Sequence, residues 1–206
     1  LLTYNTYGQQ SFCEKTMEES LQQIAEMLKK PESKELWGIS LNAPVVIIDH
    51  FNNKMFFTAI ENGEMQPIKE EQWDNKIPLA NSFFEYNGIK YVTIIYPSFI
   101  NIPCEQRINL LSHEIFHLHQ NDLGINNVSS VNYHMDEVQG RALLQIEMKL
   151  LQQVLNGDIQ CLYDALLIRT YRQDLYPDNN EDLYELNEGS AEYTGIRLSI
   201  SDVRRY

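Results

Sequence analysis

The spacing of the apolar residues changes near Pro103, and this change constrains the fold more than any other feature. Before it, short apolar runs alternate with turn residues: Val45 to His50, Lys54 to Ile60, Phe83 to Tyr86 and Ile89 to Tyr96. After it, apolar residues recur at every third or fourth position, which is the spacing of helices. Strands followed by helices predict an α+β fold, strand-rich over 1–100 and helical over 101–206.

Turn and capping residues set the limits of the predicted elements. Asn52-Asn53 and Asn87-Gly88 each separate two apolar runs and predict hairpins. Thr16 and Glu19 form a capping box that opens a helix over 16–30, and Pro31 ends it. A weak strand is expected at Met65 to Lys69, and later helices from Pro103 to about Leu118 and over 136–156, 158–175 and 180–198. A length of 206 residues fits a single domain over 1–206.

One predicted helix contains a motif with a defined chemistry. His113-Glu114-Ile115-Phe116-His117 has the pattern HExxH. Residues four apart project from the same helix face, so His113 and His117 can bind one ion. Zinc prefers a small tetrahedral set of N, O or S ligands, and Glu114 lies beside them as a candidate general base. The alternative is two partly exposed histidines on an amphipathic helix.

A catalytic zinc site needs a third protein ligand and an open position. Glu188 and Glu192 lie four apart in Asn187-Glu188-Gly189-Ser190-Ala191-Glu192 and share one face of a predicted helix. One carboxylate could bind the metal, and the other could accept a hydrogen bond from a ligating histidine. The alternative is an acidic, solvated helix face. Among the other histidines, His119 points away from the pair, while His134 lies in a loop and could approach the site.

HEIFH followed by NEGSAEY resembles the gluzincin metallopeptidases, a superfamily of zinc peptidases with a zincin-like fold. The resemblance implies His113, His117 and Glu188 as zinc ligands and Glu114 as the general base that activates a zinc-bound water. It also implies a supporting position for Glu192 beside His113. A strand at the sheet edge pairs with extended substrates in this superfamily, and Ile89 to Tyr96 is the candidate for it here. The alternative is that Ile89 to Tyr96 is an ordinary strand of the sheet.

Other contributions to the reaction stay open at this stage. A Tyr, His or Arg side chain normally helps to stabilise an oxyanion, and Tyr193 and His134 are the candidate oxyanion donors. Arg169 and Arg172 share a helix face near acidic residues, so ion pairing is their simplest role. The long segment between His117 and Glu188 could form a lid, a wall or a scaffold.

Composition limits the partners. The chain has 16 basic and 29 acidic residues and a net charge of −13, which argues against nucleic acid as a partner. No apolar stretch has the length of a membrane span. Cys13, Cys104 and Cys161 form neither a disulfide framework nor a metal pair by their spacing.

The localisation of the protein stays open. The chain begins at Leu1. Export followed by removal of a signal segment would account for that, as would truncation.

These observations favour a zinc-dependent hydrolase, most simply a metallopeptidase that acts on a peptide or protein substrate with Zn²⁺ as cofactor. The main alternative is a zincin-like binding or regulatory protein that keeps the zinc site without turnover. A structural protein without metal is the third hypothesis. The oligomeric state is not determined by the sequence.

Overall fold

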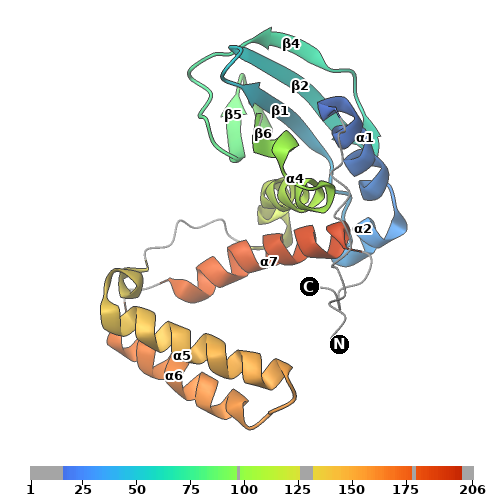
Figure 1. The fold of residues 1–206 in the computed structure, drawn as a ribbon. Coiled ribbons are helices and arrows are strands. Elements are labelled where there is room, and N and C mark those ends of the chain that lie inside the picture. Colours follow the sequence, from blue (N-terminus) through green and yellow to red (C-terminus); the bar gives the residue numbers. More distant parts are fainter. Residues whose placement is uncertain (1–15, 97, 126–131, 178–179, 201–206) are drawn as a thin grey trace, which may run out of the picture. The chain divides into compact units, whose positions relative to one another are not determined.

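The computed structural model describes residues 16–96, 98–125, 132–177 and 180–200. The chain divides into two compact units, one formed by 1–127 with 188–206 and the other by 128–187. The second unit therefore falls wholly within the sequence between His117 and Glu188. The fold is α+β as predicted, with a sheet in the first half and helices in the C-terminal half (Figure 1).

A six-stranded mixed sheet forms the centre of the first unit. Its strands are β1 (Ala43–Asp49), β2 (Lys54–Glu61), β3 (Glu64–Met65), β4 (Lys69–Gln72), β5 (Ser82–Tyr86) and β6 (Ile89–Tyr96). The order is β3-β2-β1-β6-β5, and β4 also pairs with β2. β1 and β6 are parallel, and the other pairs are antiparallel.

The predicted hairpins are confirmed, and their turns explain the sequence signals. Asn87 and Gly88 both have positive φ, 52° and 79°, as a two-residue type I′ turn requires. Asn53, before β2, has φ of 56°. The predicted strand at Met65 to Lys69 is wrong, because β3 and β4 are separate strands on either side of Pro67. Proline has no N–H to donate, which interrupts the ladder with β2.

The position expected for Ile89 to Tyr96 also needs correction. This strand, β6, lies inside the sheet between β1 and β5, and β5 is the strand at that edge. Val92, Thr93 and Ile94 are fully buried. The centre of β6 is buried, as expected for a strand between two others that is covered on both faces, whereas β5 is only partly buried.

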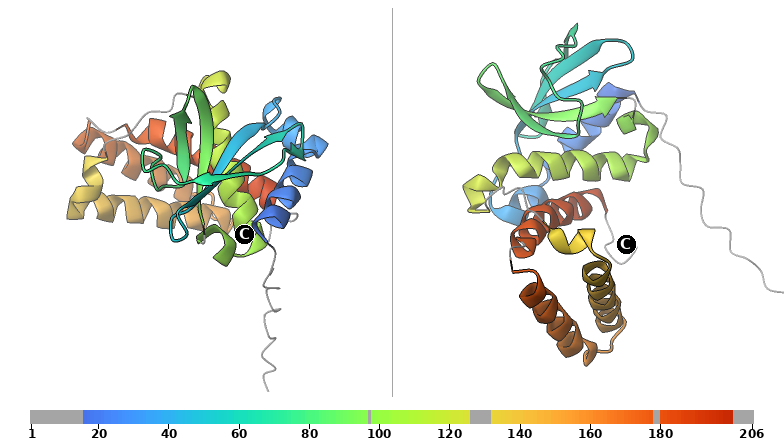
Figure 2. Two further views of the ribbon diagram at one scale, coloured as in Figure 1. Left: turned by 90° about the horizontal axis from the view of Figure 1, so that it is seen from above. Right: turned by 90° about the vertical axis from the view of Figure 1, so that its left-hand side faces the viewer.

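Helices α1 (Met17–Leu28) and α4 (Cys104–His119) cover one face of the sheet (Figures 1 and 2). The capping box of Thr16 and Glu19 is present at the start of α1. Pro31 does not only end α1; it is also the first residue of α2 (Pro31–Trp37), a position where its fixed φ suits a helix. The remaining short helices of this unit are α3 (Ser98–Asn101) and η1 (Asn121–Leu123).

Two apolar clusters fill the two faces of the sheet. Val45 and Ile47 of β1 pack with the buried residues of α1 and α4. Val46 and Ile48, which alternate with them, pack on the other face with Met55 and Ile77. Successive side chains of a strand point to opposite faces, so the apolar run of β1 contributes to a core on both faces, and α4 packs against one of them.

The second unit contains η2 (Tyr133–Asp136), α5 (Val138–Leu155) and α6 (Cys161–Leu175). Helix α7 (Glu181–Ser199) begins in this unit and continues into the first. Arg172 is fully buried and pairs with Glu147 and Glu181, while Arg169 pairs with Glu147, Asp182 and Glu185. The predicted ion pairing of both arginines is confirmed. No helix among the described residues has the length and apolarity to cross a bilayer.

Candidate metal centre

Helix α4 brings His113 and His117 together. Leu111, Ile115 and Phe116 are fully buried in the core, and this packing fixes which face of α4 carries the two histidines. Their Nε2 atoms lie 3.0 Å apart. The predicted pairing of the HExxH histidines on one helix face is confirmed.

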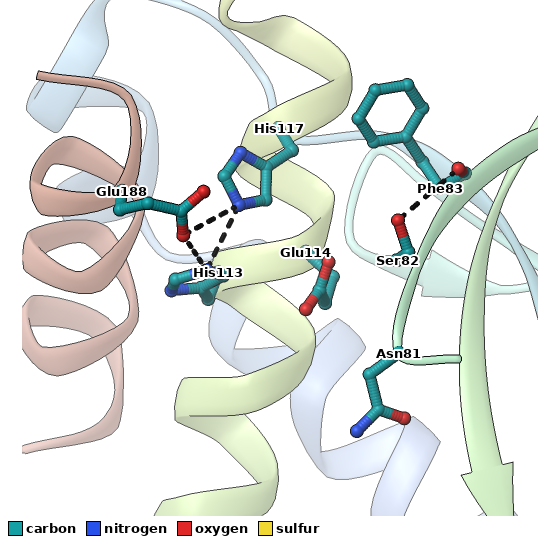
Figure 3. A pocket seen from close by; sticks show the side chains of 7 residues that line it. All are labelled: Asn81, Ser82, Phe83, His113, Glu114, His117 and Glu188. Atoms are coloured by element: carbon teal, nitrogen blue, oxygen red, sulfur yellow. Dashed lines mark hydrogen bonds and ion pairs between the residues drawn. The ribbon is translucent and has the colours of Figure 1, made fainter. Parts of the chain in front are cut away.

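Helix α7 contributes the third group. Oε2 of Glu188 lies 3.4 Å from Nε2 of His113 and 3.7 Å from Nε2 of His117 (Figure 3). These three atoms are the one group of potential metal ligands that the described residues contain, and they lie within 4.8 Å of one another. The residue proposed as third ligand from the sequence is therefore next to the histidine pair.

The spacing of these atoms is compatible with their binding one divalent metal ion, zinc among others. Two ligand atoms that each lie about 2.0–2.1 Å from a tetrahedral ion are roughly 3.3 Å apart. The three observed separations lie between 3.0 and 3.7 Å. Two imidazole nitrogens and one carboxylate oxygen are a donor set that zinc and other divalent transition metals accept.

Each histidine has a hydrogen-bonding group near its Nδ1 atom, the ring nitrogen that is not part of the metal group. Nδ1 of His113 lies 3.5 Å from Oε2 of Glu192, and Asn109 donates from Nδ2 to the other Glu192 oxygen at 3.3 Å. Nδ1 of His117 lies 2.8 Å from the side-chain oxygen of Gln120. With a proton on Nδ1, each Nε2 keeps its lone pair for a metal.

Gln120 was not predicted from the sequence. It lies just beyond the end of α4, three residues after His117, and is fully buried. Its amide nitrogen also donates to the hydroxyl of Ser190 on α7 at 3.1 Å. An amide at position i+3 from a ligating histidine can reach that ring, but nothing in the sequence singles Gln120 out from other polar residues of the segment.

Glu114 lines the same pocket as the three ligand groups. The pocket holds about 210 Å³, and its lining also includes Asn81, Ser82 and Phe83. Glu114 is only 8% exposed. Burial, and secondly the carboxylate of Glu188, raise the pKa of Glu114 to about 7. This carboxyl group is thus able to accept and return a proton near neutral pH.

The electrostatics of His113 also suit a metal ligand. Burial, and then the neighbouring His117, lower the pKa of His113. The neutral imidazole is the form that binds metal.

His113 and Glu114 also line a second pocket, which has a volume of about 310 Å³. Gln106, Asn109 and Glu192 contribute to its lining.

Contacts within the first unit fix this part of α7. Trp37 of α2 donates from Nε1 to the hydroxyl of Thr194 at 2.8 Å, and the Trp37 ring packs on Phe116 of α4. A Cβ added to Gly195 would lie 2.0 Å from Oδ1 and 2.8 Å from the carbonyl oxygen of Asn109. The absent side chain therefore lets α7 approach α4 closely enough for Glu188 to reach the histidines.

The other predicted candidates each have contacts of their own. Tyr193 packs edge-on against Trp37 and does not line either pocket. His134 is buried in the second unit, 3.6 Å from Glu181. Their roles as oxyanion donors stay predictions. His119 lies 2.8 Å from the carbonyl oxygen of Asn42 and packs apart from the metal group, as expected. Cys104 and Cys161 form no disulfide with another described residue, and Cys13 lies outside the described residues.

Comparisons of this chain with models of known protein families, with curated proteins and with solved structures found no match.

Proposed function

We propose that this protein is a zinc-dependent hydrolase, most simply a metallopeptidase with a zincin-like fold. One observation carries the proposal: the carboxylate of Glu114 lines the same pocket as the two imidazoles and the Glu188 carboxylate. A structural zinc site needs four protein ligands and no general base. Three ligands with a buried, protonatable carboxyl group beside them are the composition of a hydrolytic site.

Each residue then has a defined task. His113, His117 and Glu188 hold the ion. When bound, Zn²⁺ is a Lewis acid that polarises a carbonyl group and lowers the pKa of water. Glu114 takes the proton of the attacking water and returns it to the nitrogen of the leaving amine. A pKa of about 7 suits both transfers, because the group neither holds nor releases the proton too strongly at neutral pH.

Strand β5 supports an extended peptide as substrate. It is an edge strand of the sheet, and its first residues, Ser82 and Phe83, line the pocket beside Glu114. An edge strand can pair with a peptide main chain and gives affinity with little dependence on sequence.

The described lining of both pockets contains no Lys or Arg to hold a terminal carboxylate. We therefore expect cleavage within a chain rather than removal of its C-terminal residue.

Turnover of blocked peptides tests the proposal. The protein is loaded with one equivalent of Zn²⁺ and incubated with a mixed-sequence set of quenched fluorescent peptides that are blocked at both ends. We expect cleavage that a chelator abolishes, and a loss of about 10²–10⁴-fold in Glu114→Gln, the usual contribution of a general base. Zinc content of the variant should equal that of the wild type.

Glu105→Gln is the matched control, because Glu105 is an exposed residue in the first turn of the same helix and lines neither pocket. It should leave the activity unchanged. Equal activity of the Glu114→Gln variant and the wild type would contradict the mechanism. Zinc binding without cleavage of any peptide would instead favour the binding or regulatory alternative.

A further inference from the structure

The second pocket beside the metal group is lined mainly by one face of α4. Its α4 residues follow one another at helical spacing: Gln106, Asn109, Leu110, His113 and Glu114. Residues three and four apart share a helix face, so this pocket extends from His113 toward the first turn of α4. Ile102, which precedes α4, and Glu192 of α7 complete the described lining. All of these residues belong to the first unit.

This pocket meets the metal group on the side of Glu114. It shares His113 and Glu114 with the pocket that contains the three ligand groups, whereas His117 and Glu188 line only the latter. In the proposed function, Glu114 returns its proton to the nitrogen of the leaving amine, so that nitrogen must lie beside Glu114. The residue that carries this nitrogen is therefore the part of the substrate whose side chain is nearest to the second pocket.

The second pocket combines an apolar wall with a negative charge. Ile102 and Leu110 are partly exposed and form the wall. Gln106 and Asn109 add amide groups, and Glu192 adds a carboxylate. The described lining contains no Lys or Arg to neutralise that carboxylate. The pocket therefore favours a side chain that is long, apolar along its stem and positive at its end.

Glu192 is held in place before a substrate arrives. One carboxylate oxygen accepts a hydrogen bond from Nδ2 of Asn109 at 3.3 Å, and the other lies 3.5 Å from Nδ1 of His113. The side chain of Glu192 is nevertheless 47% exposed. An ionised carboxylate offers about four acceptor sites, so Glu192 can support His113 and bind a substrate cation at the same time.

The other classes of side chain fit this pocket less well. An aliphatic side chain would take water from Glu192 and the two amides without replacing its hydrogen bonds, which costs free energy. An acidic side chain would face the carboxylate of Glu192 and be repelled. Lysine and arginine can bury their apolar stems along Ile102 and Leu110 while the charged end stays polar surroundings.

We propose that the second pocket binds a basic side chain, so that the protein cleaves peptide chains on the amino side of lysine or arginine. The inference rests on the proposed function, because the position of the leaving amine follows from the role of Glu114. Glu192 then has two tasks: it positions His113, and it selects the residue that follows the cleaved bond.

Three peptides that differ in one residue test the proposal. Each is an alanine-rich peptide blocked at both ends, with lysine, norleucine or glutamate at its centre; norleucine has the stem of lysine without the charge. Mass spectrometry should locate cleavage at the bond that precedes the central residue. We expect kcat/KM to be about five-fold higher for lysine than for norleucine, as for an ion pair that stays partly exposed, and lowest for glutamate.

Two variants change the charge of the pocket. Gln106→Lys places a cation in it without touching a metal ligand and should make the glutamate peptide a better substrate than the lysine peptide. Gln22→Lys is the matched control, because Gln22 is exposed on α1 and lines neither pocket; it should leave the preference unchanged. Glu192→Gln keeps an oxygen near Nδ1 of His113 and should abolish the preference for lysine over norleucine. A ratio of two rates is compared, so a general loss of activity does not affect the result.

Peptide binding separates this inference from the proposed function. Zinc-loaded Glu114→Gln should bind the fluorescently labelled lysine peptide with a Kd about five-fold lower than that of the norleucine peptide, and adding Gln106→Lys should remove the difference. If this holds while the wild type cleaves no peptide, the proposed function fails and the pocket still binds basic side chains. Equal Kd values for the two peptides overturn the inference, and so does cleavage on the carboxyl side of lysine.

Discussion

The side-chain oxygen of Gln120 lies 2.8 Å from Nδ1 of His117, where it can accept a hydrogen bond from the tautomer that leaves Nε2 free for a metal. The same carboxamide donates to Ser190 on α7 at 3.1 Å. Gln120 thus connects a histidine of α4 to the helix that carries Glu188, through one fully buried side chain. It orients the site without belonging to the ligand set.

Gln120→Leu should lower the affinity for Zn²⁺ by about 10–100-fold, the usual cost of removing a partner behind a ligating histidine. Without an acceptor at Nδ1, the His117 ring can adopt the other tautomer and turn away. Competition against a chromogenic chelator measures the affinity. Gln120→Glu keeps an oxygen acceptor for Nδ1 and should stay closer to the wild type than the leucine variant. An unchanged affinity in Gln120→Leu would rule out the positioning role.

The HExxH pair was predictable because its geometry is local. A spacing of four places two side chains on one helix face wherever the helix lies, so His113 and His117 needed no tertiary information. Glu188 and Glu192 required the resemblance, because their distance from the histidines depends on how α7 packs against α4. That packing is set by single contacts such as Gly195 against Asn109, which no periodicity encodes.

The strand order was less accessible from the sequence. Each hairpin was predictable because its turn lies in the chain between its strands. The parallel pair of β1 and β6 joins segments that are far apart in sequence, and local patterns do not specify such pairs. The expectation that β6 is an edge strand failed for this reason. Its centre, Val92 to Ile94, is fully buried, but the polar Thr93 within it weakens the sequence signal for an interior position.

Gly195→Ala should destabilise the protein and weaken zinc binding together. The added Cβ would meet the backbone carbonyl oxygen of Asn109 at 2.8 Å and its side-chain oxygen at 2.0 Å. Backbone cannot move aside cheaply, so a loss of about 1–3 kcal/mol in the free energy of unfolding is expected. Because α7 must shift away from α4, Glu188 moves from the histidines. Urea unfolding and chelator competition measure the two effects.

Gly189→Ala is the matched control on the same helix. A Cβ at Gly189 has no atom within 4 Å, and alanine favours helix over glycine by up to about 1 kcal/mol. This variant should be as stable as the wild type or more stable, with unchanged zinc affinity. If both variants behave alike, close approach of α7 to α4 is not what positions Glu188.

Glu114→Gln should stabilise the metal-free protein at alkaline pH. The pKa of Glu114 is raised in the folded state from 4.5 to about 7, mainly by burial. Between these values the folded state binds a proton that the unfolded state has released, so stability falls as pH rises through this range. The neutral glutamine removes this loss, which amounts to at most about 3 kcal/mol. Unfolding by urea in chelator at pH 4 and pH 8 measures it.

The wild type and Glu114→Gln should therefore be similar in stability at pH 4 and differ at pH 8. A difference that is the same at both pH values would contradict the raised pKa of Glu114. Glu105→Gln, the exposed control on α4, should show no such dependence on pH.

Arg172→Met should destabilise the second unit. Arg172 is fully buried between Glu147 and Glu181, and removing it leaves two buried carboxylates facing each other. Breaking a buried ion pair on one side costs about 3–5 kcal/mol. Amide hydrogen exchange of α5 and α6 measures the loss where it occurs.

Replacing all three partners should reverse that loss, because a buried charged group is expensive only when it is left without its partner. Arg172→Met combined with Glu147→Leu and Glu181→Leu fills the site with apolar groups and removes every desolvated charge of the triad. Such replacements are often neutral or stabilising, and Arg169 keeps Asp182 and Glu185 as partners after Glu147 is lost. We expect exchange rates in α5 and α6 near those of the wild type. A triple variant as labile as Arg172→Met would mean that the ion pairs themselves, rather than the avoidance of unpaired charge, hold these helices together.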